Sequence, residues 1–482
     1  MYSNGEFYIT TPIYYINGVP HIGSAYTTIV ADTLARWREA QGEVVTFLTG
    51  TDEFAQKTPD AAEKTGEEVH VYAERMANAW METWHKLGIS NTDFIRTTEE
   101  RHIDTVKDFW GRLDAAGDIY KGQYEGLYCK GHEAFIKESD LVDGLCPEHK
   151  TAPERVVEEN YFFKLSNYQQ RLLEFYEAHG DFVAPAHRFN EVKAFVEDGL
   201  EDISFSRERK GNRVQWGIPV PNDPGQVIYV WADALVNYIS AIGIEKWEEH
   251  PADIHTVGKD ILRFHAVIWP AMLMSAGLPL PGQIIANGFL TVNGTKMGKS
   301  LGNVIDPLEL TSRYGNDGLR YFLLREISYG DDGDFSEEKM KERYNADLAN
   351  GLGNFAARVL TLAEKESVQF GRLDAEFEAA IRDAKRAVQE KMANFKFSDA
   401  LAAIWAVISL GDRYVNEKKV WEIKDAAARS QALFNLVSFL DNVAAMLVPF
   451  LPETSKKITA AIAWKDNVLD VKKPEILFPR IK

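Results

Sequence analysis

The amino-terminal segment of the chain reads as a β-strand, a turn, an α-helix and a second β-strand. Residues 6–10 are apolar and β-prone, and turn-forming residues at 17–20 precede a helix that we expect to begin near Gly23 and stop at Gly42. A second strand over 44–48 follows. Two strands joined by a helix predict the α/β class, with a doubly wound parallel sheet of the Rossmann type.

Polar residues follow both predicted strands. In doubly wound folds the ligands bind at the carboxyl ends of the strands. Four residues therefore lie where a nucleotide would be held: His21, Gly23, Ser24 and Asp52. A glycine at a helix start allows a phosphate to approach the backbone N–H groups at the positive end of the helix dipole.

A second candidate phosphate site lies downstream, where Lys296 and Lys299 are separated by Met297 and Gly298. Ammonium groups on a mobile loop suit a phosphate chain that gains negative charge during a reaction. Taken alone, the two lysines fit a solvated basic turn better, and the phosphate interpretation depends on the first candidate site. The chain contains no Gly-x-x-x-x-Gly-Lys-Ser/Thr sequence, so the site differs from a Walker P-loop.

Composition narrows the class of protein. The chain has 482 residues, 45% of them hydrophobic, which is ample for packed cores. Its net charge of −18 argues against a general nucleic-acid coat, although a local basic face could still bind nucleic acid. No apolar run approaches the roughly 20 residues of a membrane span, and no signal peptide is recognisable. The two cysteines argue against a disulfide framework. We expect a soluble cytoplasmic protein.

The pattern of residues predicts a discontinuous α/β domain followed by helices. Its halves cover 1–119 and 214–305, and an insertion with short apolar runs and many turns covers 120–213. We expect the sheet to resume with 215–220 and 227–231, to continue with 254–257 and to end near Leu290. A mixed region over 306–343 leads to a helical domain over 344–482. There an apolar stripe recurs at helical spacing: Leu433, Leu436, Leu440, Val443 and Leu447.

The insertion contains both cysteines of the chain, each followed three residues later by a histidine. The pairs are Cys129 with His132 and Cys146 with His149. Two thiolates and two imidazoles form a tetrahedral zinc ligand set, so we predict one structural Zn²⁺. The alternative is two buried thiols near surface histidines.

The motifs together resemble a known family. Pro-His-Ile-Gly at 20–23 and Lys-Met-Gly-Lys-Ser at 296–300 resemble the two signatures of class I aminoacyl-tRNA synthetases, usually written HIGH and KMSKS. The surrounding residues narrow the resemblance to the methionyl-tRNA synthetases, and it runs nearly from end to end. The segments that carry it are 11–15, 49–53, 229–234, 258–265 and 318–326.

The resemblance implies a two-step reaction. Methionine and ATP give methionyl-adenylate and pyrophosphate, and the methionyl group then passes to the terminal adenosine of tRNA(Met). Catalysis would rest on positioning and charge stabilisation, with Mg²⁺ assisting. The catalytic residues implied are His21, Lys296 and Lys299. The ATP-binding residues implied are Gly23, Ser24, Gly258, Asp260, Asn287 and Lys299.

The family resemblance also implies which residues recognise methionine. Asp52 matches the carboxylate that binds the substrate ammonium group. The residues implied around the thioether side chain are Ile13, Tyr15, Trp231, Ala234, Leu235, Tyr238, Ile261 and His265, with Ile268 and Trp269 more weakly indicated. Aromatic and aliphatic walls suit a polarizable sulfur.

The resemblance further implies a stem-contact region over 306–343 and an anticodon-binding helical domain, where Trp464 is a weak candidate for anticodon contact. A monomer is expected, because no further carboxyl-terminal module follows. An insertion of this length leaves no room for a large editing domain. The cysteinyl enzymes, which hold zinc inside the amino-acid site, fit less well. Family members often carry a zinc knuckle in the insertion, although with more cysteines.

The chain departs from the family pattern at a few positions. Ser24 replaces the second histidine of the first signature, and Gly298 replaces the serine of the second. Phe54-Ala55 replace a common His-Gly pair, and Asn287 replaces a common histidine. These departures leave open a catalytically silent relative that binds RNA or a protein partner.

Overall fold

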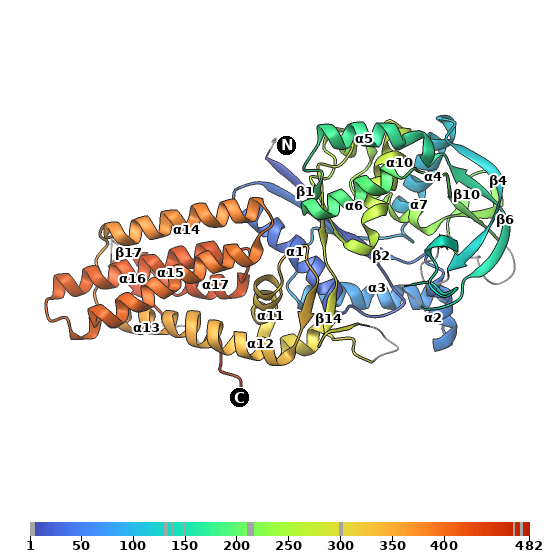
Figure 1. Ribbon diagram of the computed structural model, residues 1–482. Helices are drawn as coiled ribbons and strands as arrows, with labels where there is room; N and C mark the ends of the chain where they lie inside the picture. The colour runs from blue at the N-terminus through green and yellow to red at the C-terminus, as the bar shows by residue number, and fades with distance from the viewer. Residues whose placement is uncertain are drawn as a thin grey trace. The chain divides into compact units, whose positions relative to one another are not determined.

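The computed structural model describes residues 5–129, 134–136, 138–147, 150–209, 216–297, 302–465, 468–472 and 476–482 (Figure 1). They form two compact units. The first unit comprises residues 1–20, 44–85 and 91–286, and the second comprises 21–43, 86–90 and 287–482. No helix among these described residues is long and apolar enough to cross a membrane.

The first unit is built on a six-stranded sheet with the order β3-β2-β1-β12-β13-β7. The strands are β1 (Glu6–Tyr15), β2 (Val44–Asp52), β3 (Asp93–Arg96), β7 (Val183–Ala184), β12 (Ile254–Gly258) and β13 (Gln283–Asn287). β1 pairs in parallel with β2 and β12, β2 with β3, and β13 with β7. The predicted doubly wound parallel sheet is confirmed, and the short polar strand β3 was not foreseen.

Helices of the first unit bury apolar stripes in one core. They include α4 (Glu100–Ala115), α5 (Gln169–Ala178), α6 (Ala186–Glu197) and α10 (Trp269–Ala276). Helices α2 (Lys57–Thr65) and α3 (Val69–Lys86) also bury apolar residues, which are not part of this core. In α4 the buried residues recur at helical spacing: His102, Val106, Phe109, Trp110 and Leu113. The core also contains the fully buried side chains of Trp247 and Trp269.

The region predicted as an insertion contains a four-stranded sheet with the order β5-β4-β6-β8. Its strands are β4 (Ile119–Cys129), β5 (Ala134–Ile136), β6 (Glu154–Phe163) and β8 (Ile203–Ser204), and their pairings are antiparallel. The chain within this region also supplies β7, which pairs with β13 and so belongs to the main sheet.

The prediction that 215–220 and 227–231 continue the main sheet is wrong. β10 (Pro219–Val220) and β11 (Asp223–Ile228) form a separate antiparallel sheet with β9 (Ser206–Glu208). The following residues form two short helices, α7 (Val230–Ala234) and α8 (Asn237–Ser240), and α9 (Ile244–Glu249) comes after them. β-Branched and aromatic residues suggested a strand over 227–231, but propensity does not determine which sheet a strand joins.

The second unit begins with α1 (Ile22–Glu39) and contains a small sheet of β15 (Thr295–Lys296), β14 (Leu290–Val292) and β16 (Gly333–Phe335). Helices α11 (Pro307–Glu326) and α12 (Glu337–Arg343) and a π-helical turn (Tyr344–Gly353) follow.

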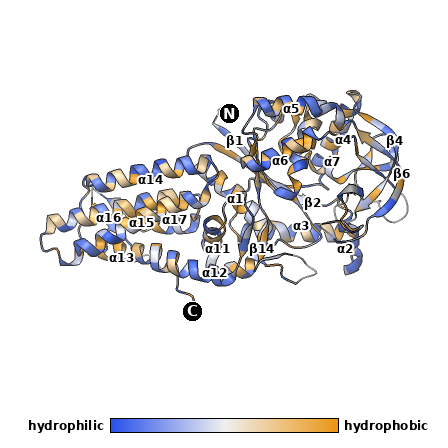
Figure 2. Cartoon of the chain, viewed as in Figure 1, coloured by the Kyte–Doolittle hydropathy of each residue, from blue (hydrophilic) through white to orange (hydrophobic). Residues whose placement is uncertain are grey.

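The remaining helices of the second unit form a bundle: α13 (Asn354–Ala363), α14 (Ala375–Ala393), α15 (Phe397–Lys418), α16 (Ala426–Leu447) and α17 (Pro452–Ala460). The Leu433 to Leu447 stripe is fully buried in α16, as predicted. Figure 2 shows apolar and polar residues alternating along α13 and α14, as amphipathic helices require. Beyond α17 the expected helix gives way to a hairpin of β17 (Ile462–Lys465) and β18 (Val468–Val471).

Candidate active site

In the first unit, candidate residues lie at the carboxyl ends of three neighbouring strands. Tyr15 is the last residue of β1, Asp52 the last of β2 and Gly258 the last of β12. β1 lies between β2 and β12, and the order of the strands reverses there, because β2 and β3 extend one side of the sheet and β12 the other. Doubly wound sheets bind ligands at such a switch point. Of the four residues that the sequence placed at strand ends, Asp52 lies at this edge, and His21, Gly23 and Ser24 belong to the second unit.

Asp52 is held at this edge by its neighbours. Its side chain is buried, and its Oδ1 accepts a hydrogen bond of 3.3 Å from the Phe54 N–H. Glu53 is fully buried and receives a two-pronged contact from Arg96, with Nε–Oε1 at 2.7 Å and Nη2–Oε2 at 3.1 Å. Paired contacts of this kind fix orientation as well as charge. Sequence reasoning missed Arg96, because 43 residues separate it from Glu53 and no spacing rule connects them.

The predicted methionine-pocket residues contribute to one aromatic and aliphatic surface. Trp231 stacks on Phe264 with ring centroids 3.9 Å apart and meets Tyr15 edge-on at 6.4 Å. Phe264 begins a π-helical turn over Phe264–Ile268, a feature frequent at functional sites. Five of the predicted residues are only partly buried against the core and leave apolar surface accessible: Ile13, Tyr15, Trp231, Ile261 and Ile268. Ala234 and Leu235 are buried, and Trp269 is packed against Phe109 within the core.

The polar end of this surface is a tyrosine–histidine pair. The Tyr238 hydroxyl lies 2.6 Å from His265 Nε2, and His265 Nδ1 lies 3.0 Å from the Ile261 carbonyl oxygen. A carbonyl can only accept a hydrogen bond, so Nδ1 carries the ring proton and Nε2 accepts from Tyr238. Burial lowers the pKa of His265 to about 4, so the ring is neutral at physiological pH.

After β12, the chain turns over Gly258 into a short 3₁₀ helix that contains Asp260. A Cβ atom at position 258 would lie 2.5 Å from Asp260 Oδ1. A side chain at position 258 would therefore displace the end of the flexible Asp260 side chain. The two residues predicted to hold ATP ribose are thus coupled sterically.

In the second unit, His21 is the N-cap of α1. Its Nδ1 accepts from the N–H groups of Gly23, at 3.1 Å, and Ser24, at 3.3 Å. Ser24 Oγ accepts from the His21 N–H at 3.0 Å and lies 2.8 Å from the His21 carbonyl oxygen. The reciprocal bonds form a capping box. Because Nδ1 accepts, the neutral ring carries its proton on Nε2. The serine that departs from the family signature therefore has a defined structural role.

Gly23 connects the two signatures. A Cβ atom at this position would lie 3.0 Å from the His21 ring and 3.2 Å from Met297 Cε. The chain also returns to the start of α1 just after the second signature, where the Ile22 N–H donates to the Ile305 carbonyl at 3.0 Å. Lys296 lies on β15 and pairs through its backbone with Thr291. Gly298, Lys299 and the side chain of Lys296 lie outside the described parts of the chain.

Asn287, predicted to bind ATP, is buried and bonded within the second unit. Its Oδ1 accepts from the Thr27 hydroxyl of α1 at 3.0 Å, and its Nδ2 donates to the Gly288 carbonyl oxygen at 3.0 Å. The amide is thereby bonded to the second turn of α1, a contact that the sequence did not suggest.

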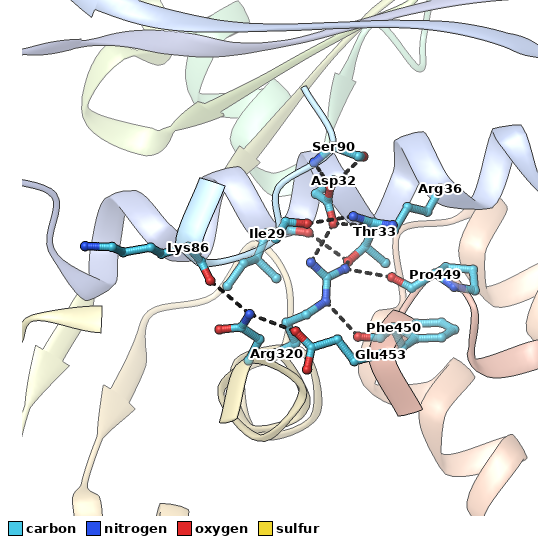
Figure 3. Close-up of polar contacts among 12 residues, drawn as sticks. Ile29, Asp32, Thr33, Arg36, Lys86, Ser90, Arg320, Pro449, Phe450 and Glu453 are labelled. Carbon is cyan, nitrogen blue, oxygen red and sulfur yellow. Dashed lines mark hydrogen bonds and ion pairs between the residues drawn. The ribbon is translucent and has the colours of Figure 1, made fainter. Parts of the chain in front are cut away.

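A buried ion pair anchors the carboxyl-terminal half of α1 (Figure 3). Asp32 is fully buried; its Oδ1 accepts from the Ser90 N–H and hydroxyl, both at 2.7 Å, and its Oδ2 accepts from Arg36 at 2.8 Å and Arg320 at 2.5 Å. Arg320, on α11, also donates to the carbonyl oxygens of Pro449 and Phe450, each at 2.8 Å. These carbonyls follow the end of α16, so one guanidinium ties the signature helix to the bundle.

The predicted zinc ligands are only partly within the described residues. Cys129 and Cys146 are buried and neither forms a disulfide bond. His132 and His149 lie outside the described residues, and within the remainder of the chain no cluster of three or more metal-binding side chains occurs. Trp464 lies on β17, but its side chain also falls outside the description.

Family models match most of the chain. A model described as "tRNA synthetases class I (M)" matches residues 7–156 and 149–360, and one described as "Anticodon-binding domain of tRNA ligase" matches residues 374–478. Curated methionine–tRNA ligases are similar over nearly the full length. That of Thermotoga maritima is 44% identical, with 96% of this chain and 76% of the relative covered. That of Rhizobium meliloti is 44% identical, with 96% and 93% covered.

Solved structures of methionyl-tRNA synthetases are also similar to this chain. Methionyl-tRNA synthetase of Mycobacterium tuberculosis in complex with methionyl-adenylate superposes with a TM-score of 0.93 at 38% identity, with 98% of this chain and 100% of that chain covered. Its apo form superposes with a TM-score of 0.86 at 36% identity, with 99% and 98% covered. The chain therefore belongs to the methionyl-tRNA synthetase family of class I aminoacyl-tRNA synthetases.

Proposed function

We propose that this chain is a methionine–tRNA ligase that activates methionine with ATP and charges tRNA(Met). In the first step a methionine carboxylate oxygen attacks the α-phosphorus of ATP, and the bond to the β-phosphate breaks, which gives methionyl-adenylate and pyrophosphate. In the second step the terminal ribose hydroxyl of the tRNA takes the methionyl group and AMP leaves. The observation that carries the proposal is the nearly full-length match to ligases of this one amino acid.

For Asp52, Trp231 and His21 the local geometry supports the proposed roles, whereas those of the two lysines rest on the family resemblance. Asp52 would bind the substrate ammonium at the end of β2, and the Trp231 surface would receive the thioether side chain. His21 would donate from Nε2 to a phosphoryl oxygen, since its Nδ1 is committed to the helix cap. Lys296 and Lys299 would stabilise the charge that develops on the phosphates.

ATP would be held by residues that lie far apart in the sequence. The candidates are Gly23 and Ser24 at the start of α1, Gly258 and Asp260 after β12, Asn287, and Lys299. Mg²⁺, when bound, neutralises charge on the phosphates. It is usually held largely by phosphate oxygens and water, so few protein ligands are needed.

We further propose that Cys129, His132, Cys146 and His149 hold one structural Zn²⁺. The buried thiols and the absence of a disulfide bond between them fit this donor set. Metal analysis of the purified chain should find about one zinc per molecule, and Cys129→Ser should lower that ratio. A zinc content near zero in the unmodified protein would contradict the site.

The helical bundle and the β17–β18 hairpin, with Trp464, would contact the anticodon. The domain boundaries at 119, 213, 305 and 343, a monomeric state and a cytoplasmic location likewise stay predictions from the family resemblance.

The alternative is a silent relative that binds RNA without catalysis. Amino-acid-dependent ATP–pyrophosphate exchange, measured with methionine and several other amino acids, discriminates between the two. Exchange that depends on methionine alone supports the ligase, whereas no exchange despite tight tRNA binding would refute it. Ser24→His and Gly298→Ser test whether the departures slow adenylate formation, and unchanged rates in both would show that they are neutral.

A further inference from the structure

A buried serine–histidine–aspartate chain lies in the first unit, outside every role assigned above. His102 of α4 is fully buried; its Nε2 lies 2.7 Å from Asp233 Oδ1 and its Nδ1 lies 2.9 Å from Ser240 Oγ. Ser240 Oγ also lies 2.8 Å from the Val236 carbonyl oxygen. The residue types resemble a hydrolytic triad, but a nucleophile must reach a substrate and be deprotonated by its histidine. The Ser240 hydroxyl is buried and bonded to its own helix, so hydrolysis is excluded.

The positions of the protons in this serine–histidine–aspartate hydrogen-bond network follow from which atoms can only accept. A carbonyl oxygen can only accept, so the single hydroxyl proton of Ser240 goes to Val236. Two oxygens at 2.8 Å without a proton between them would repel each other. His102 Nδ1 must then donate to Ser240 Oγ. In a neutral ring this leaves Nε2 as an acceptor, and Asp233 must supply the proton for the remaining hydrogen bond.

The surroundings of Asp233 fit a protonated carboxyl group. The residue is 1% exposed, and its Oδ2 has no hydrogen-bond partner among the residues that the structure describes. An ionised carboxylate with one unsolvated oxygen is costly in such a site. Burial raises the pKa of Asp233 well above its usual range, and burial lowers the pKa of His102 to about 3. Both pKa shifts favour a neutral Asp233 carboxyl group that donates to a neutral His102 imidazole.

The two partners of His102 lie on the helices that carry the predicted methionine pocket. Asp233, on α7, stands between Trp231 and Ala234, and Ser240, on α8, follows Tyr238 by two residues. We propose that His102 is a positioning residue for methionine recognition, which holds α7 and α8 against α4 through a neutral bridge from the Asp233 O–H to Nε2 and from Nδ1–H to Ser240. This inference rests on the proposed ligase function.

The bridge predicts that a neutral donor can replace Asp233. In Asp233→Asn the amide Nδ2 can donate to His102 Nε2 in nearly the same shape, so the KM for methionine in pyrophosphate exchange should stay within about threefold of the unmodified enzyme. Asp233→Ala removes the donor and leaves a void next to His102. The KM for methionine should then rise about tenfold or more, while the KM for ATP changes by less than about twofold. His250→Ala, which breaks another histidine–aspartate pair of the first unit, is the matched control and should change neither KM.

Several results would overturn the inference. If Asp233→Asn raises the KM for methionine as much as Asp233→Ala does, the negative charge is needed and the neutral bridge is wrong. Equal changes in both KM values would reveal general weakening rather than positioning. Infrared spectroscopy gives an independent test should Asp233→Ala not fold: the unmodified protein should show a protonated carboxyl stretch that Asp233→Asn lacks. A missing band would refute the bridge, whereas absent methionine-dependent exchange in the unmodified chain would refute the proposed function instead.

Discussion

Replacing Arg320 with methionine is the most severe single test of the buried network in the second unit. The change keeps an apolar stem of similar length and removes the guanidinium. Asp32 then retains Arg36 and Ser90 but loses its shortest ion-pair contact, and the carbonyl oxygens of Pro449 and Phe450 lose their donor. None of these groups can turn to solvent easily, because Asp32 is fully buried and Arg320 is 1% exposed.

The magnitude follows from the desolvation of the partners left behind. Removing one member of a buried ion pair costs about 3–5 kcal/mol. Each buried carbonyl left unsatisfied would add ~1–3 kcal/mol in isolation, although these costs are not additive and Arg36 offsets part of the first. We therefore expect Arg320→Met to lower the free energy of unfolding of the second unit by about 4 kcal/mol.

Urea unfolding followed by intrinsic fluorescence and by circular dichroism measures this change. The control is Arg386→Met, which removes a surface ion pair with Asp383 whose side chains are 80% and 60% exposed. That change should shift the free energy by less than about 0.5 kcal/mol. A double variant with Asp32→Leu should be less unstable than the two single changes summed, because replacing a whole buried pair by apolar groups removes the unpaired charge. A loss of under ~1 kcal/mol for Arg320→Met would refute the reasoning.

Three further predictions concern α1. Gly23→Ala should lower kcat for pyrophosphate exchange about tenfold or more by displacing the His21 ring, while Gly111→Ala, where a Cβ meets nothing within 4 Å, should leave it unchanged. Ser24→Ala should destabilise the protein by about 1 kcal/mol through loss of the capping box, and Ser24→Thr should restore most of it in thermal unfolding. Burial raises the pKa of Asp32, but Arg320 and Arg36 outweigh burial and hold it below its usual range. Its stabilisation should therefore be complete above about pH 3.9 and be lost at lower pH, and Asp32→Asn should flatten that acid limb of the stability curve.

The parts of the fold that sequence reasoning predicted are those with strong periodic patterns. The strand–helix–strand opening and the α16 stripe from Leu433 to Leu447 are confirmed, because burial on one face leaves a repeat that can be read along the chain. β3 and β7 are short and carry little periodicity, so they become strands only by pairing with β2 and β13. Val227 and Ile228 at the end of β11 have the propensity of a strand, but antiparallel pairing with β9 puts them outside the main sheet.

Some features of the candidate site could likewise be predicted from the sequence, and others could not. Asp52 could be predicted at the edge of the sheet because the sequence places it at the end of the second strand, and Tyr15 followed only from the family resemblance, since the predicted first strand stopped at Thr10. The contacts that fix them could not. Glu53 and Arg96 are 43 residues apart, and Asp32 and Arg320 are 288 apart, so no local pattern records that they meet. Buried polar partners are chosen by the tertiary fold, and one sequence does not show the choice.

Ser24 illustrates how a departure from a motif can be read from physics. A histidine at this position could touch ATP directly, and its replacement suggested a weakened site. In the structure the Ser24 hydroxyl instead accepts from the His21 N–H and closes the capping box. The backbone N–H groups of Gly23 and Ser24 donate to His21 Nδ1, so the neutral ring keeps its proton on Nε2. A donor toward phosphate therefore survives without a second histidine, provided that the cap stays intact. If His21 acts on the phosphates as proposed, the effect of changing Ser24 on adenylate formation should depend on whether His21 is present.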